Sequence, residues 1–181
     1  SKLVSLFLKR QFGILQKYIN EILIDNNYLK LIKKDEENDE VPDRIYEVVI
    51  ARSFSKIISY LNFGYIELLI EAKEELKTLK EIAEIREEPD IWWVIRLILI
   101  IISGIEKASL WSVFKKHYNN IPPIVSKFIY SHVFAEYTKI YEFFSTQRQA
   151  LEQVIGKDSG LVISMPTSSG KTRIDEVAIL D

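Results

Sequence analysis

The sequence predicts a mainly α-helical fold, an irregular helical bundle that is followed near residue 161 by a single βα unit. Apolar residues recur at helical spacing through most of residues 1–143. A hydrophobic content of 48% with 28% charged residues is typical of a globular protein. The apolar run Leu161-Val162-Ile163 precedes a glycine-containing turn and a short amphipathic run, which is the order strand, loop and helix.

The first third of the chain predicts two helices and a charged loop. Apolar residues at helical spacing over 3–32 indicate one helix, which Asp25-Asn26-Asn27 are expected to end or break. The charged stretch 33–40 has no apolar residue to bury and is expected to be a solvated loop. Pro42-Asp43 is typical of a helix start, and the helical spacing then continues to Leu61.

Residues 62–64, Asn-Phe-Gly, predict a turn, and residues 65–88 predict a strong helix rich in Glu, Lys, Leu and Ala. Pro89-Asp90 ends this helix and opens the next. The following run, 91–102, is the most apolar of the chain, but it is shorter than the roughly 20 residues that a membrane span needs. Apolar side chains on all sides of it favour a helix buried in the centre of the bundle, which Ser103-Gly104 ends.

This apolar run also holds three side chains with a polar group. Arg96 is expected to reach a carboxylate or the surface, because an unpaired buried charge is costly. Trp92 and Trp93 are interpreted as buried or half-buried core residues, with a platform for stacking nucleic-acid bases as the alternative.

Three further helices are expected before the βα unit. One follows Gly104 and ends near Lys115-Lys116-His117, whose charge suits a helix C-terminus better than contact with phosphate. The next spans about 124–143, and its aromatic stripe indicates core packing. Ser145-Thr146 are N-cap candidates for a helix over 147–155. His117 and His132 stand apart from other ligands and predict no metal site.

Residues 165–172, Met-Pro-Thr-Ser-Ser-Gly-Lys-Thr, have the chemistry of a phosphate-binding loop. Backbone N–H groups of such a loop and of the following helix N-terminus favour anionic phosphate, and Gly170 permits close approach. Lys171 can reach the β- and γ-phosphates, and Thr172 can offer its hydroxyl to Mg²⁺. Met165 stands where the general pattern has glycine.

Residues 166–172 resemble motif I of the superfamily 2 helicases, especially the Ski2-like and DEAD/DEAH-box branches, which commonly have a non-glycine residue at the position of Met165. Residues 146–151 resemble the Q-motif element of these families. The resemblance implies that Gln147 reads the adenine edge, that Phe144 offers the base an apolar face, and that Glu176 lies in the helix after motif I.

The resemblance covers residues 144–181 and implies the truncated start of a RecA-like helicase domain, preceded by a helical domain over 1–143. It implies the N-terminal part of an ATP-dependent helicase or translocase that acts on DNA or RNA in its full-length form, with ATP and Mg²⁺ as cofactors. The fragment by itself is expected to be inactive, because the later motifs that phosphoryl transfer needs are not in it. The implied ligands of ATP are Gln147, Thr167, Ser168, Ser169, Gly170, Lys171 and Thr172, with Lys171 catalytic and Thr172 on the metal.

The alternative interpretation is a helical protein-interaction or regulatory domain attached to a P-loop ATPase that is not a helicase. The formal net charge of −2 provides no global attraction to nucleic acid. The lack of cysteine fits a reducing cytoplasm, and the N-terminus lacks the cleavage site of a signal peptide. We therefore expect a cytoplasmic protein without a membrane segment, with a protein partner for the helical domain as a further expectation.

Overall fold

The computed structural model describes residues 1–24, 40–156, 164 and 170–180, which form nine α-helices and no strand. The helices are α1 Lys2–Leu8, α2 Phe12–Ile24, α4 Glu40–Phe63, α5 Ile66–Ile85, α6 Pro89–Ala108, α7 Leu110–His117, α8 Pro123–Val133, α9 Ser145–Val154 and α10 Lys171–Leu180. The prediction of a mainly α-helical fold is confirmed. The strand predicted at 161–163 lies outside the described residues, so the βα unit is not part of the fold described here.

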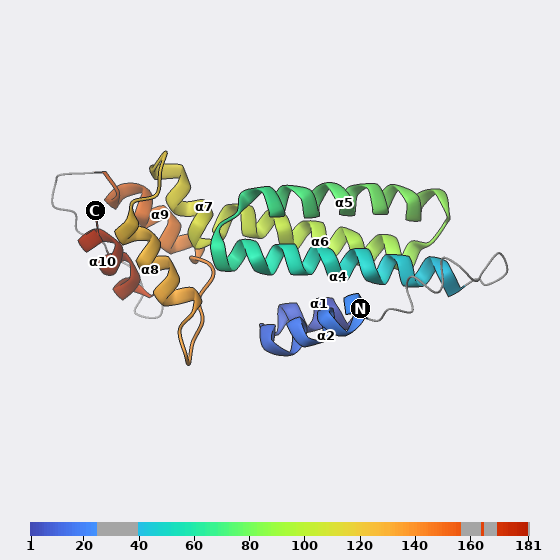
Figure 1. Cartoon of the computed structure of the whole chain (residues 1–181). Coiled ribbons are helices and arrows are strands. Elements are labelled where there is room, and N and C mark those ends of the chain that lie inside the picture. Colours follow the sequence, from blue (N-terminus) through green and yellow to red (C-terminus); the bar gives the residue numbers. More distant parts are fainter. Residues whose placement is uncertain (25–39, 157–163, 165–169, 181) are drawn as a thin grey trace. The chain divides into compact units, whose positions relative to one another are not determined.

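The chain divides into two compact units, Ser1–Ile102 and Ser103–Asp181. The domain boundary predicted between residues 143 and 144 does not coincide with this division and stays a prediction, because the units are defined by packing and the prediction by a sequence motif. Figure 1 shows the long helices α4, α5 and α6 of the first unit and the short helices α7 to α10 of the second.

The first unit is built on the hairpin of α4 and α5. Gly64 joins the two helices with φ 76°, a left-handed conformation that glycine adopts without strain, and its N–H donates to the carbonyl of Tyr60. The core between the helices is apolar and includes the fully buried side chains of Ala51, Phe54, Ile57, Leu69, Ala72 and Leu76. The turn at 62–64 and the helix over 65–88 are thus found close to their predicted places.

α1 and α2 form a second, smaller hairpin beside α4, and the ring of Phe7 on α1 lies 5.2 Å from the ring of Phe54 on α4. The sequence predicts one helix from residue 3 to an end or break at Asp25-Asn26-Asn27; the structure corrects its first part, while α2 ends at Ile24, directly before those residues. The backbone turns at Arg10, which has φ 55°, so α1 ends at Leu8 and α2 begins at Phe12. The apolar spacing resumes beyond the turn, and the sequence therefore resembles that of one helix.

Two polar contacts support the packing of the long helices. Lys56 on α4 donates to Glu71 at 2.8 Å and to Glu75 at 2.9 Å, both on α5. Burial by itself lowers the pKa of Lys56, but the hydrogen bonds and the negative charge of the two carboxylates outweigh it and raise the pKa above 10.5. Burial, followed by the charge and hydrogen bond of Glu47, likewise raises the pKa of Tyr18 on α2.

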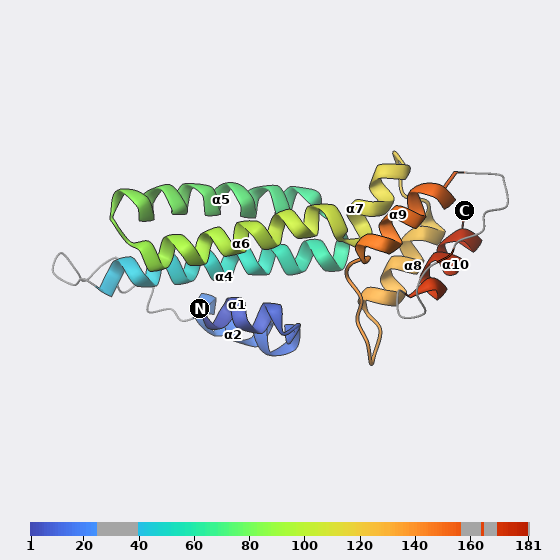
Figure 2. The same ribbon diagram turned by 180° about the vertical axis from the view of Figure 1, so that it is seen from behind.

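α6 continues beyond the predicted stop at Ser103-Gly104 and ends at Ala108. A glycine inside a helix costs only about 1 kcal/mol relative to alanine, and the burial of Ile102 and Ile105 on either side of Gly104 offsets it. The break comes instead at Ser109, whose Oγ accepts the N–H of Ser112 at 3.1 Å and caps α7. Figure 2 shows α6 along its length between α5 and α4.

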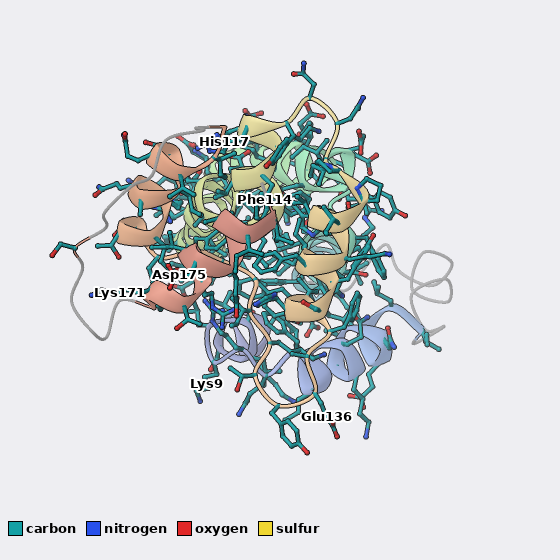
Figure 3. The ribbon with its side chains drawn as sticks, turned by 90° about the vertical axis from the view of Figure 1, so that its left-hand side faces the viewer. Lys9, Phe114, His117, Glu136, Lys171 and Asp175 are labelled. Carbon is teal, nitrogen blue, oxygen red and sulfur yellow. The ribbon has the colours of Figure 1, made fainter. Side chains whose placement is uncertain are left out.

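The second unit surrounds the buried ring of Phe114 on α7, which is labelled in Figure 3. The ring lies 5.9 Å from those of Phe128 and Phe143. The helix predicted over 124–143 is corrected, because α8 ends at Val133. The chain then returns, and the N–H groups of Leu110 and Phe143 bond to the carbonyls of Tyr141 and Ala108 across the Ser109–Glu142 bridge.

Candidate functional site

Of the residues predicted to bind a nucleotide, Thr167, Ser168 and Ser169 lie outside the described residues, as does Met165. Lys171 and Thr172 are exposed in the first turn of α10. Lys171 is labelled in Figure 3. Gly170 immediately precedes this helix with φ 72°. The roles predicted for these residues, and ATP and Mg²⁺ as cofactors, stay predictions.

Gln147 is buried, with an exposed fraction of 3%, and both ends of its amide make hydrogen bonds. Its Oε1 accepts the N–H of Phe144 at 2.8 Å, and its Nε2 donates to the carbonyl of Gly170 at 3.1 Å. The first contact corrects the predicted N-cap at Ser145-Thr146. The helix α9 begins at Ser145, so the N-cap residue is Phe144, and the side chain of Gln147 accepts the N–H of Phe144. The second contact links the start of α9 to the start of α10, so Gln147 joins two helices of the unit.

Gly170 is required by this contact for a steric reason. A Cβ atom at this position would lie 2.5 Å from Nε2 of Gln147, and φ 72° disfavours any side chain. The sequence predicts a glycine here for the approach of phosphate. The structure shows a second use for it, which is the approach of the Gln147 amide.

α10 also approaches α8, where Nε2 of His132 lies 3.5 Å from Oε2 of Glu176, an oxygen that accepts no hydrogen bond among the described residues. Nδ1 of His132 lies 2.9 Å from the carbonyl of Phe128. In the part of the chain that the structure describes, no group of three or more His, Asp or Glu side chains is arranged to hold a metal ion. The basic residues Lys115, Lys116 and His117 occupy the last turn of α7, as predicted.

α6 carries the clearest surface feature of the first unit. Its buried side is lined by Ile95, Ile98 and Ile102, each with an exposed fraction of 0%. Its other side exposes large apolar side chains one turn apart, namely Trp93 (61%), Leu97 (41%) and Ile100 (59%). We call Trp93, Leu97 and Ile100 the α6 stripe. The predicted burial of this helix on all sides is therefore wrong.

Arg96 lies within the exposed side of α6. Its guanidinium lies 5.1 Å from the ring centre of Trp92 and 5.2 Å from that of Trp93, which is the distance of a cation–π contact. Arg96 is exposed, which confirms the expectation that it reaches the surface. Among the residues that the structure describes, it forms no salt bridge, so the two rings orient a guanidinium whose hydrogen-bond donors face solvent.

Trp92 also lines a cavity of about 380 Å³ at the corner between α5 and α6, together with Glu84, Glu87 and Glu88. Lys80 lies 5.4 Å above the same ring, and Arg86 pairs with Glu88 at 3.1 Å. At this corner, Glu88 therefore has a cation of the same unit beside it. Trp92 is half-buried as predicted, whereas Trp93 is mostly exposed.

The described residues thus define a mainly α-helical protein with an exposed apolar face on one long helix. No helix within these residues is long and apolar enough to cross a membrane. No family model matches the chain. The chain is similar to a protein of Bacillus cereus that is described as Hachiman protein HamB, with 35% identity over 181 residues. The alignment covers 99% of this chain but 15% of that protein, so the chain spans a small part of its relative's length.

These findings correct the family assignment made from the sequence. The resemblance to superfamily 2 DEAD/DEAH-box helicases is overturned, because no helicase family model matches and the similar protein is described as a Hachiman protein. The function predicted from that resemblance, an ATP-binding helicase or translocase with a P-loop, is corrected with it.

The α6 stripe was missed in the sequence because the run 91–102 is apolar at nearly every position. A helix of this composition presents no polar side, and its pattern therefore cannot separate the residues that pack from those that remain exposed. The one signal was Arg96, since a charged residue at this position marks the exposed direction.

Proposed function

We propose that the chain is the helical, protein-binding part of a HamB-like Hachiman protein that acts in defence, and that the α6 stripe is its binding surface. The single observation that carries the proposal is the exposure of Trp93, Leu97 and Ile100 on one side of a helix whose other side is fully packed. Contiguous apolar surface of this kind marks sites of protein interaction. The similarity to Hachiman protein HamB, a component of a defence system, supplies the context of defence.

The composition of the stripe supports protein binding. Tryptophan and arginine dominate the energetics of protein interfaces, and here Trp93 and Arg96 lie together with their relative orientation set by a 5.2 Å contact. A side chain that is ordered before binding loses less conformational entropy when the partner arrives. These properties support the α6 stripe as the surface that we propose for a protein partner.

The test is a phage challenge of bacteria that express the complete protein in its native system. We expect the double substitution Leu97→Asp with Ile100→Asp to lose protection, because two carboxylates on the stripe cannot be buried by a partner. Thr78→Asp on the exposed side of α5 is the matched control and keeps protection. Unfolding curves of the purified variants establish that both are folded.

Full protection by the double variant, at a normal level of folded protein, contradicts a binding role for the stripe. Loss of protection in the Thr78→Asp control would show that the assay responds to any added charge. In that case the assay would not support the α6 stripe as the binding surface.

A further inference from the structure

The chemistry of the α6 stripe defines what it binds. We infer that its partner is an acidic amphipathic α-helix, which lays apolar side chains on the stripe and a carboxylate against Arg96. This inference rests on the proposed function and names the kind of partner.

The spacing of the stripe indicates a helical partner. Trp93, Leu97 and Ile100 follow the pattern i, i+4, i+7, which forms a narrow, nearly straight row along a helix. Such a row is complemented along its length by the apolar row of a second helix, as in the helix-in-groove mode of recognition. A strand or a loop would contact only part of it.

The charge of the face indicates an acidic partner. Arg96 is the one charged residue in the run 91–102. It forms no salt bridge among the described residues, and the rings of Trp92 and Trp93 hold its guanidinium at 5.1 and 5.2 Å. When a partner covers the stripe, Arg96 loses part of its contact with water, and a carboxylate then compensates that loss with bidentate hydrogen bonds.

A single-stranded nucleic acid is a less suitable occupant. Binding of this kind requires a positively charged groove along the backbone and several aromatic rings for successive bases. The α6 stripe offers one exposed ring, that of Trp93, and one cation, while Leu97 and Ile100 supply aliphatic surface. Aliphatic side chains at helical spacing match a protein helix instead.

The experiment has two stages and uses the complete protein in its native cells. First, the photoreactive residue p-benzoylphenylalanine replaces Leu97, and mass spectrometry identifies the segment that it captures. Thr78 receives the same photoreactive residue as a control. We expect position 97, and not position 78, to capture one helical segment with apolar residues at i, i+4, i+7 and an Asp or Glu beside them.

The second stage tests the charge on the identified segment, supplied as a synthetic peptide of its sequence. Arg96→Glu is expected to weaken binding by about 10- to 100-fold. Replacing the facing carboxylate of the peptide with arginine is expected to restore binding to Arg96→Glu while weakening binding to the unchanged chain. Arg96→Gln, which removes the charge but keeps a polar amide, is expected to show an intermediate affinity.

The outcomes separate this inference from the proposed function. No capture at position 97 overturns both. The inference of an acidic helix is overturned if position 97 captures a segment without a carboxylate, a nucleic acid, or the same face in a second copy of the chain. Equal affinity of the Arg96→Glu variant and the unchanged chain also overturns it, and in that case a captured protein segment leaves the proposed function standing.

Discussion

The long helices of the first unit and the short helices of the second are stabilised by different kinds of contact. α4 and α5 pack through a continuous apolar core in which Phe54, Leu69 and Leu76 are fully buried. In the second unit, α9 and α10 are joined by the amide of Gln147, and α8 and α10 by His132 and Glu176. The packing of α4 on α5 therefore depends on buried volume, whereas the docking of α10 adds single polar groups to the burial of Ile174 and Val177.

The same contrast explains where the surface for a partner lies. One side of α6 is fully packed through its buried isoleucines. Its other side can therefore expose Trp93, Leu97 and Ile100 without loss of the fold. The second unit also exposes large apolar side chains, but Ile124 (55%) and Tyr130 (39%) on α8 lie six residues apart and do not follow the pattern i, i+4, i+7 of the α6 stripe.

The largest effect on stability is expected from Phe54→Ala in the first unit. The ring has an exposed fraction of 0% and contacts Phe7, so its removal leaves a cavity that costs about 3–5 kcal/mol. Chemical denaturation measures this loss. Phe63→Ala on the same helix is the control, since that ring is 44% exposed. If both substitutions lower the stability by the same amount, buried volume does not dominate the stability of the first unit.

In the second unit, Gln147→Ala is expected to cost about 1–3 kcal/mol, because the N–H of Phe144 and the carbonyl of Gly170 both lose a partner. Hydrogen exchange of α10 should accelerate more than that of α4. Gln149→Ala, an exposed position on the same helix, is expected to change stability by less than about 0.5 kcal/mol. Unchanged exchange in α10 would falsify the link through Gln147.

Two glycine-to-alanine substitutions are expected to change stability in opposite directions. Gly170→Ala should destabilise the docking of α10 by about 1–2 kcal/mol, because of φ 72° and the close approach of the Gln147 amide. Gly104→Ala should stabilise α6 by about 0.5–1 kcal/mol, because a Cβ there has no atom within 4 Å. Thermal unfolding of the two variants measures these changes. If both substitutions shift the unfolding temperature in the same direction, the different roles given to Gly170 and Gly104 are contradicted.

The smallest effect on stability is expected from Lys56 and Tyr18 in the first unit, at alkaline pH. The pKa values of Lys56 and Tyr18 are raised above 10.5 and 10.0, so the native state holds both protons more tightly than the unfolded chain. Their contribution is therefore complete below about pH 10 and is lost as the pH rises through the raised values. Lys56→Met is expected to cost less than about 0.5 kcal/mol at pH 7 and to flatten the alkaline decrease in stability, as measured by denaturation at successive pH values.

The sequence predicted the long helices well and the helix ends poorly. The helices α4 and α5 follow from apolar spacing and from Gly64, because these are local properties. The turn at Arg10, the continuation of α6 through Gly104 and the early end of α8 depend on tertiary contacts, and the sequence has no pattern for them. The sequence singled out Gln147 for contact with adenine, which stays a prediction, and it could not show that the amide contacts Gly170.

The candidate surface was less predictable than the fold. The composition of residues 91–102 indicated burial, and only the packing of α6 shows that Ile98 lies inside while Leu97 lies outside. The resemblance of residues 166–172 to a helicase motif directed attention to the end of the chain, and the similarity to Hachiman protein HamB overturned the assignment.

The most direct test of the central claim is the reactivity of a thiol at position 97. The chain contains no cysteine, so Leu97→Cys introduces a single thiol into it, and Thr78→Cys provides an exposed control. The rate of labelling is compared between the isolated chain and the complete protein in its native cells, with mass spectrometry of the peptide. We predict that labelling of position 97 slows by about tenfold or more in cells while that of position 78 does not change. Equal rates at position 97 in both settings would contradict a partner on the α6 stripe.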